Sequence, residues 1–402
     1  MTQDEKFLDK KMDRREFLKK AGIGGAGLAL GLSGASAFFA KKTDEQEKIS
    51  YGDETIRFYG QHQAGITTAM QKNIYFVVLD LHTTDKDKVI QLFKDWTDYS
   101  AKLVEGELVK IDGTNKLLPP SDTGETVGLN PHRLTLTFGV SADFLKKMGL
   151  ESKRPKLFRD MPPFPKEQLQ DKYTGGDIVI QACADDEQVA FHAIRNLIRK
   201  GRNTVTMKWS QSGFAAIGNR METPRNLFGF KDGTANVTKE SDFDDVVWAD
   251  SKDWMQDGSY MAVRRIQMHL ETWDRTNLQE QENTFGRYKE SGAPFGKKHE
   301  FDEVDLDLLP VDSHVRLAKQ VNKPIYRRSY SYSDGIDEVT GQFDSGLLFI
   351  SYQKDPDSFV KLQTSLGADD KMNEYVTHIG SGLFACFGGV QKGEYLGQKL
   401  FE

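Results

Sequence analysis

The feature that most constrains the fold of this chain is an alternation of strand-like and helix-like segments. Residues 73–81 are rich in β-branched and aromatic side chains, which is typical of a strand, and residues 85–103 repeat apolar side chains at helical spacing. The same order returns at 134–145 and at 177–199, with a proline-rich stretch, 155–165, between these two units. This order predicts an α+β domain in which helices pack on one sheet.

A second set of such segments follows in the other half of the chain. It comprises an alternating strand-like run, two further strand-like runs that could pair, a helical pattern and a last strand-like run, at 259–270, 326–332, 346–352, 359–366 and 382–387. We therefore expect two similar α+β halves, residues 56–215 and 216–402. No repeat at the level of single residues is visible.

The composition excludes some classes of function. The chain of 402 residues is 38% hydrophobic and 28% charged, as in ordinary soluble globular proteins, and its formal net charge of -6 argues against nucleic-acid binding. The two cysteines, Cys183 and Cys386, lie far apart and neither belongs to a C-x-x-C pair. They therefore predict no zinc site, and they could form one disulfide or none.

The N-terminus carries an export pattern. Arg14 and Arg15 precede an apolar, glycine-rich run that ends in a small-residue pattern at 35–37. This resembles a twin-arginine signal peptide over residues 1–37, followed by a polar leader, 38–55. A permanent membrane anchor is the alternative. With either, the body of the protein would lie outside the cytoplasm, at the cell surface, in the periplasm or secreted. Because twin-arginine export carries folded proteins, a cofactor is expected.

The stretch GFKDGTAN, residues 229–236, places one carboxylate, Asp232, among small residues where the backbone can approach a flat ligand. Asp-Gly is a common turn dipeptide, so a plain turn, a helix N-cap and a phosphate-binding loop are all compatible with this stretch alone.

His314 and Arg327 are further candidates. His314 stands in the segment DSHVRLA, and Arg327 begins the strand-like run that follows. A heme ligand needs one imidazole on a rigid segment, with the opposite side of the iron free for a substrate. On that side a peroxidase needs a group that moves a proton and a fixed cation, and Asp232 and Arg327 are of the right types. A lone histidine is more often structural, so that alternative stays open.

Taken together, these residues resemble the dye-decolorizing peroxidase family, in particular its exported deferrochelatase branch. The resemblance covers most of the chain. It rests on several motifs in the family's order, namely the twin-arginine start, FYGQHQAGI, GFKDGTAN, Arg264-Arg265 with ETWDRT, DSHVRLA, RRSYSY and GLLFISYQ.

The resemblance implies two ferredoxin-like domains, 56–215 and 216–402, with antiparallel sheets and peripheral helices, as in the dimeric α/β-barrel superfamily. It also implies heme b (iron protoporphyrin IX) as the cofactor. His314 would be the axial ligand of the heme iron, and Asp232 and Arg327 would be the catalytic pair on the distal side.

The resemblance extends to residues around these three. Gly233, Thr234 and Ala235 would border the porphyrin edge. Leu347 and Phe349 share one face of a strand, so they would either line the distal pocket or pack in an ordinary core.

Several charged residues are harder to assign. Arg327 is preferred to Arg328 by its place in the motif, and strand alternation turns such neighbours to opposite faces. Arg316 would contact a heme propionate or form a surface ion pair. Glu374 is the expected carboxylate behind His314. The remaining histidines considered are expected to be structural or to face solvent, namely His62, His132, His192, His269, His299 and His378.

The function implied by the resemblance is reduction of hydrogen peroxide through a ferryl intermediate, with electrons from a donor that the sequence does not identify, in the service of iron uptake with iron-permease components. One alternative is a deferrochelatase, for which heme is the substrate and the porphyrin is left intact. Another is a heme carrier without catalysis. Formation of a homo-oligomer stays open.

Overall fold

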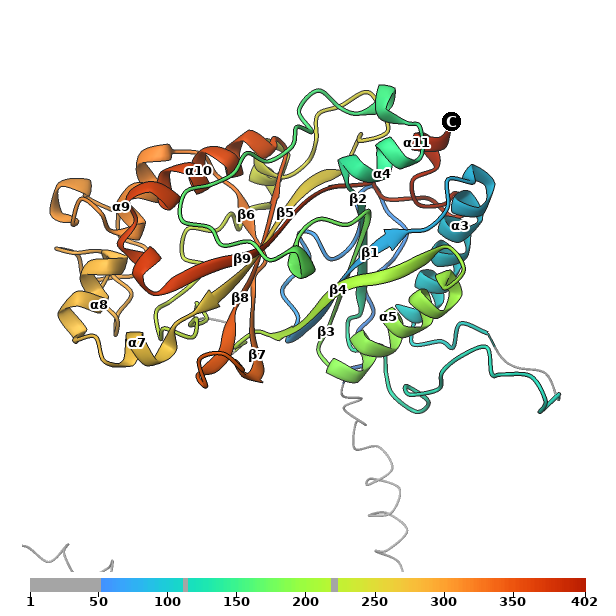
Figure 1. Ribbon diagram of the computed structural model, residues 1–402, viewed down its shortest axis with the longest axis horizontal. Coiled ribbons are helices and arrows are strands. Elements are labelled where there is room, and N and C mark those ends of the chain that lie inside the picture. The colour runs from blue at the N-terminus through green and yellow to red at the C-terminus, as the bar shows by residue number, and fades with distance from the viewer. Residues whose placement is uncertain (1–51, 111–114, 218–222) are drawn as a thin grey trace, which may run out of the picture. The chain divides into compact units, whose positions relative to one another are not determined.

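The strands of both halves join in one antiparallel sheet. The computed structural model describes residues 52–110, 115–217 and 223–402. Within them the sheet has nine strands in the order β5-β9-β2-β3-β1-β4-β7-β8-β6 (Figure 1). A further pairing between β5 and β8 closes it into a barrel. The predicted signal peptide and residues 38–51 of the predicted leader lie outside the described residues.

Each half contributes consecutive strands to this sheet. The first half supplies β1 (Asn73–Leu81), β2 (Thr135–Val140), β3 (Ile178–Ala184) and β4 (Val205–Phe214). The second half supplies β5 (Ser259–Met268), β6 (Tyr326–Arg327), β7 (Tyr330–Ile336), β8 (Phe343–Gln353) and β9 (Val376–Cys386). The pairings β2–β9 and β4–β7 join the two halves.

Helices lie outside the sheet (Figure 1). The α-helices are α3 (Lys86–Leu103), α4 (Ala142–Lys147), α5 (Glu187–Gly201), α6 (Phe243–Val246), α7 (Leu270–Asp274), α8 (Leu278–Phe285), α9 (His314–Val321), α10 (Pro356–Asp369) and α11 (Gln398–Phe401). The short 3-10 helices are η2 (Glu151–Lys153), η3 (Asp171–Tyr173), η4 (Glu240–Asp242), η5 (Leu306–Leu308) and η6 (Lys371–Glu374).

Aspartate caps fix where the long helices begin. Asp85 accepts hydrogen bonds from the first amides of α3, and Asp186 does so for α5. Asp355 caps α10, whose first residue, Pro356, has no amide hydrogen to leave unpaired. A capping side chain of this kind stabilises a helix by about 1 kcal/mol.

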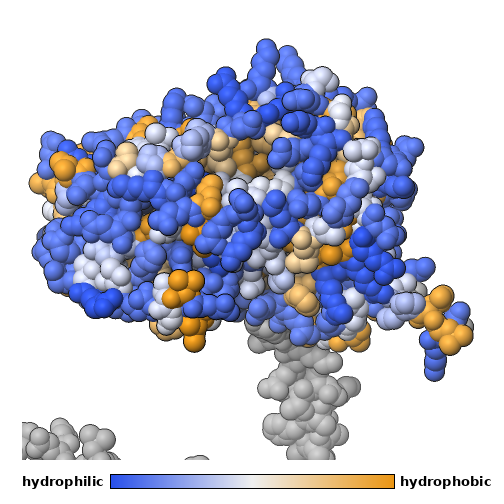
Figure 2. All heavy atoms as spheres, viewed as in Figure 1, coloured by the Kyte–Doolittle hydropathy of each residue, from blue (hydrophilic) through white to orange (hydrophobic). Residues whose placement is uncertain are grey.

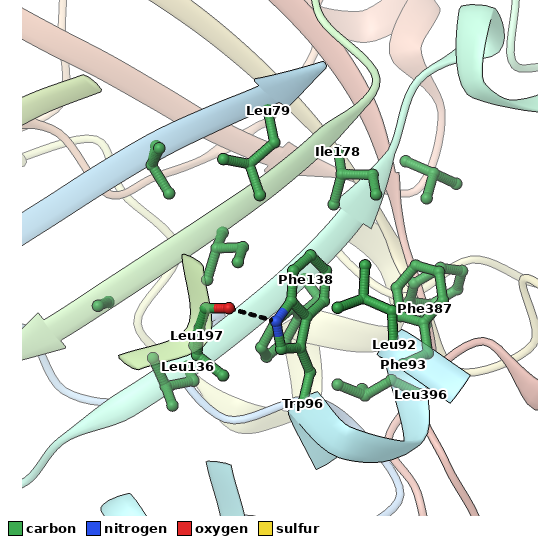
Figure 3. Close-up of a cluster of buried hydrophobic side chains, with 14 of the residues drawn as sticks. Leu79, Leu92, Phe93, Trp96, Leu136, Phe138, Ile178, Leu197, Phe387 and Leu396 are labelled. Atoms are coloured by element: carbon green, nitrogen blue, oxygen red, sulfur yellow. Dashed lines mark hydrogen bonds between the residues drawn. The ribbon is translucent and has the colours of Figure 1, made fainter. Parts of the chain in front are cut away.

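The outer face of the first half is covered by α3 and α5. Trp96 of α3 is fully buried, and its Nε1 donates to the carbonyl of Leu197 in α5 at 2.8 Å (Figure 3). Phe93 and Phe138 pack against the same indole, with ring centroids 5.7 and 5.8 Å away. This core holds both helices against the sheet.

The interior of the barrel holds a second core. Along β1, Phe76 and Val78 belong to the interior core, whereas Val77 and Leu79 belong to the core under the helices. Side chains alternate along β8 in the same way, and Leu348 belongs to the interior core. The side chains on the outer face of β5, β8 and β9 therefore do not belong to the interior core. In this half of the chain they line a cavity.

The α+β class with antiparallel strands is confirmed. The predicted strand at 326–332 is interrupted, because Arg328 and Ser329 separate β6 from β7. The last predicted strand is longer, since β9 starts at Val376. Cys183 and Cys386 are both free and buried, so of the two alternatives the structure has no disulfide.

The surface agrees with a composition rich in charge. Figure 2 shows one face of the molecule as mostly hydrophilic, with apolar side chains scattered over it. Within the part of the chain that the structure describes, no helix is both long and apolar enough to span a bilayer.

Candidate active site

A cavity of about 440 Å³ lies on the outer face of β5, β8 and β9, beside α9 and α10. Its walls are mostly apolar, and they include Ile266, Met268, Phe285, Leu347, Phe349, Phe359, Leu362 and Leu366. A concave site with apolar walls and a few converging polar groups is typical of a cofactor pocket.

The cavity collects most of the predicted site residues. Those that line it are Asp232, Gly233, Thr234, Ala235, His314, Arg327, Leu347 and Phe349. Their elements are far apart in sequence, so the closed sheet is what brings them to one place.

Asp232 and Arg327 form an ion pair in the cavity wall. Nη1 of Arg327 donates to Oδ1 of Asp232 at 2.8 Å, and both side chains are about one-quarter exposed. Asn236 fixes the backbone of Arg327, because its side chain accepts from the amide and donates to the carbonyl, each at 2.8 Å. Gly233 has φ +124, a conformation that favours glycine, and this lets the loop turn directly after Asp232.

Glu300 holds the loop that carries Asp232. Its carboxylate is 7% exposed, accepts from Nζ of Lys231 at 2.7 Å and accepts from Oγ1 of Thr234 at 2.8 Å. Burial alone would raise the pKa of Glu300, but Lys231 and the hydroxyls of Thr223 and Thr234 hold it below its ordinary value. Asp232 therefore lies between two side chains that the same carboxylate anchors.

His314 is the first residue of α9, and Asp370 lies behind it. Nδ1 of His314 is 2.6 Å from Oδ2 of Asp370, which is 3% exposed. Burial would lower the pKa of His314, but the charge and hydrogen bond of Asp370 raise it above the ordinary value. The expectation of Glu374 was wrong. Glu374 lies on the exposed side of η6, whereas Asp370, at the start of η6, reaches the imidazole.

The two adjacent arginines face opposite sides of the sheet. Arg327 lines the cavity, whereas Arg328 is 1% exposed and donates to the carbonyl of Thr68 and to the side chain of Gln71. Alternation along an extended backbone explains this division.

Arg316 does not line the cavity. Its Nη1 donates to the carbonyls of Leu306 and Leu309 at 2.7 and 2.8 Å, so it ties η5 to α9. A different arginine, Arg287, lines the cavity and is 8% exposed. Its Nη1 donates to the carbonyls of Gly292 and Glu300. Burial lowers the pKa of Arg287.

His378, which was expected to be structural or to face solvent, is a further residue of the cavity wall. It lines the cavity from β9, and burial, then Arg264 and His314, lower its pKa to about 3. Val376, two residues earlier on β9, also lines the cavity, and residues two apart on a strand share a face. This spacing is the sequence signal that could have identified His378. By contrast, His192 is buried and bonds to Asp122 at 2.8 Å, as a structural histidine would.

Comparisons with known proteins show which family the chain resembles. The family model described as Dyp-type peroxidase, N-terminal, matches residues 63–215, and the one described as Dyp-type peroxidase, C-terminal, matches residues 223–391. A protein named Deferrochelatase from Yersinia pseudotuberculosis is 38% identical over 410 residues, which cover 95% of this chain and 93% of the relative. A Deferrochelatase from Escherichia coli strain K12 is 37% identical over 416 residues, which cover 96% of each.

Solved structures show the same similarity. A DyP-type peroxidase from Streptomyces coelicolor aligns with a TM-score of 0.82 at 36% identity, covering 88% of this chain and 98% of the other. Ferric DtpA from Streptomyces lividans aligns with a TM-score of 0.81, also at 36% identity and with the same coverage.

These matches show that a protein with this closed α+β sheet is an enzyme of the heme-dependent peroxidase class. More particularly, with both family models matched over most of its described length, the chain belongs to the Dyp-type peroxidase family.

Proposed function

We propose that this protein reduces hydrogen peroxide at a heme b bound in the cavity, with His314 as the iron ligand and Asp232 and Arg327 as the groups that act on peroxide. The observation that carries the proposal is the convergence of a carboxylate-backed imidazole and an Asp–Arg pair on one apolar cavity.

The residues present fit a heme. The apolar walls suit a macrocycle, and the imidazole of His314 is backed by a carboxylate, as metal-ligating histidines usually are. Arg287 supports the fit further. It is a buried guanidinium on the cavity wall, with no carboxylate at ion-pair distance within residues 52–110, 115–217 and 223–402. We assign to Arg287 the contact with a porphyrin carboxylate, which was one of the two alternatives for Arg316.

Asp370 sets the state of the ligand. Because its carboxylate accepts the hydrogen of Nδ1, Nε2 of His314 keeps its lone pair for the iron. The negative charge behind the ring also makes Nε2 a stronger donor to the metal.

Asp232 and Arg327 handle protons and charge. When bound, the heme iron supplies the electrons that cleave the peroxide O–O bond. In that cleavage Asp232 takes the proton from one peroxide oxygen and delivers it to the other, which leaves as water. Arg327 stabilises the negative charge that develops on the departing oxygen. The 2.8 Å ion pair with Arg327 fixes the carboxylate of Asp232 in place for the first transfer.

Replacement of Arg327 by Leu tests this assignment. The variant should retain heme, because Arg327 is not the ligand, and its reaction with peroxide in stopped-flow absorbance should slow by about 10²- to 10³-fold. An unchanged rate would refute the role of Arg327.

The curated relatives favour a second candidate function. Proteins named Deferrochelatase match nearly the whole chain, so release of iron from heme with the porphyrin left intact is the alternative reaction. Incubation of the purified protein with excess heme, followed by fluorescence assay of free protoporphyrin, separates the two. Porphyrin that accumulates without added peroxide would favour the second.

We also infer a role outside the cytoplasm in iron uptake, acting with permease components. The support is the twin-arginine pattern, which precedes the described residues, together with the names of the relatives. Replacement of both Arg14 and Arg15 by Lys should retain the protein in the cytoplasm on cell fractionation. Unchanged export would remove this inference.

A further inference from the structure

A second cavity, of about 350 Å³, lies beside the first on the same face of the sheet. Along β5, Arg264 and Ile266 are two residues apart and share a face; Arg264 lines the second cavity and Ile266 the first. On β9, Ser381 lines the second cavity and His378 lines the first. The two cavities are therefore neighbours on the same face of the sheet.

The cover of the second cavity is the proline-rich segment, 155–165, to which no part of the proposed mechanism assigns a role. This segment runs from the α4 side toward α10 (Figure 1). Pro165 packs on Gly367 of α10, where an added Cβ would lie 3.1 Å from the Pro165 carbonyl oxygen. Just beyond, the amide of Gln168 donates to the carbonyl of His378 at 2.9 Å. The C-terminal end of the cover thus contacts elements that line the first cavity.

An arginine forms part of the wall of the second cavity. Arg264 is 1% exposed, and its Nη1 donates to Oγ of Ser381 at 2.8 Å while Nη2 pairs with Glu167. Its guanidinium lies over the ring of Phe164 at 5.3 Å. Nε has no hydrogen-bond partner among the described residues. The wall therefore offers a cation and a hydroxyl next to an aromatic ring.

One aromatic cluster borders both cavities. Phe359 is 6.1 Å from Phe164 and 5.9 Å from Phe349, measured between ring centroids. Phe349 and Phe359 line the first cavity, while Met161 and Leu383 belong to the same cluster and line the second. A molecule in the second cavity would thus be separated from the cofactor cavity by packed side chains and not by solvent.

The chemistry of the second cavity selects a neutral amphipathic ring. Its apolar side is built by Phe158, Met161, Pro162 and Leu383. Its charges nearly balance, since two arginines and three carboxylates line it, namely Arg159, Arg264, Asp143, Asp160 and Glu167. Asp160 is also paired with Arg154. Neither a sulfonated anion nor a cation finds an excess of opposite charge there, whereas a phenol finds apolar contact and hydrogen-bond partners.

We propose that this second cavity is the docking site for a neutral phenolic electron donor, such as a hydroquinone. The proposal rests on the proposed peroxidase function, because a porphyrin in the first cavity would leave the donor to bind elsewhere. One hydroquinone loses two electrons and two protons to become a quinone. One hydrogen peroxide takes up these two electrons and two protons and becomes two molecules of water. The electrons cross the aromatic cluster between the cavities.

Filling the cavity tests the proposal. Leu169 lines it and is 37% exposed, so Leu169→Trp can occupy the cavity without disturbing a core. With the heme-loaded enzyme, this variant should raise KM for hydroquinone at least tenfold and leave KM for peroxide and the oxidation of a sulfonated dye unchanged. Met161→Trp, from the other side of the cavity, should do the same.

The matched control is Leu157→Trp, which lies in the proline-rich segment with Met161, is 48% exposed and lines neither cavity. It should behave as wild type. Saturation-transfer NMR with hydroquinone and no peroxide gives a second readout, and the signal should be present in wild type and lost in Leu169→Trp. Equal hydroquinone KM values in Leu169→Trp and Leu157→Trp, or equal NMR signals, would overturn the docking site. Failure of wild type to turn over any donor would instead refute the peroxidase proposal.

Discussion

At the scale of single residues, the side chain behind His314 is the most informative. Asp370 is nearly inaccessible, and its short contact with Nδ1 of His314 decides which nitrogen faces the cavity. The same carboxylate accepts from the amide of Met372 at 2.8 Å, so its position is fixed independently of the histidine.

Asp370→Asn keeps the shape of the side chain but removes the charge. We expect heme affinity or activity to fall by about 10- to 100-fold and the reduction potential of the bound iron to rise, because the imidazole becomes a weaker donor. Heme titration and potentiometry measure the two effects. Glu374→Gln, an exposed carboxylate in the same turn, is the control. Equal results for the two variants would contradict the assignment.

Glu300 predicts how the free energy of unfolding depends on pH. The pKa of Glu300 is lower in the folded state than in the unfolded state. Its ion pair with Lys231 therefore stabilises the fold fully at a pH above the unfolded pKa, and this stabilisation is lost as the pH falls through the folded pKa. Glu300→Gln, which leaves the Lys231 ammonium half-buried and unpaired, should cost about 3 kcal/mol of unfolding free energy at pH 7.

The loss should shrink as the pH falls below about 4.5, and thermal unfolding of both proteins at several pH values measures it. The exposed Glu303→Gln is the control. A difference between Glu300→Gln and wild type that does not depend on pH would show that the pair is not ionised as described.

The sequence predicted some site residues and not others for a physical reason. Asp232 and Arg327 stand in motifs that resemble those of the family, and the resemblance assigned them, while alternation separates Arg327 from Arg328. Asp370 and Arg287 act through contacts with partners that the sheet and helices bring close, so no local pattern marks them. Glu374 was a wrong guess because a position in the chain does not say which side of a short 3-10 helix faces the imidazole.

At the scale of elements, periodicity in the sequence predicted the strands and helices, but it did not predict how the strands pair. The patterns at 73–81 and 85–103 became β1 and α3 nearly as expected. The closure of β5 on β8 depends on pairing between residues 79 to 93 positions apart, which side-chain alternation does not encode. Two halves were expected, and their strands share one barrel.

The helical cover of the first half supports the barrel from the side away from the cavity. Trp96→Phe keeps an aromatic ring but removes the indole donor, so the buried hydrogen bond to the carbonyl of Leu197 is lost. We expect a loss of about 1–3 kcal/mol in urea unfolding, with unchanged peroxidase kinetics of the folded protein. Unchanged stability, or loss of activity without loss of stability, would contradict this division of roles.

At the scale of the whole molecule, the barrel interior is sealed. Cys183 and Cys386 are both fully buried there as free thiols, and burial raises the pKa of Cys386. Because the thiolate is the reactive form, the native protein should not react with a thiol reagent, whereas the unfolded protein should titrate two thiols. Finding fewer than two thiols after unfolding without reductant would indicate a disulfide that the structure does not have.

The central claim is that the cavity beside this barrel holds a heme by His314. The most direct measurement is the absorption spectrum of the purified protein after addition of hemin, for wild type and for His314→Ala. We expect an intense Soret band in wild type that shifts when peroxide is added, and loss of stable heme loading in His314→Ala. A wild-type protein that stays colourless, or a His314→Ala variant with full heme occupancy and the same spectrum, would contradict the account.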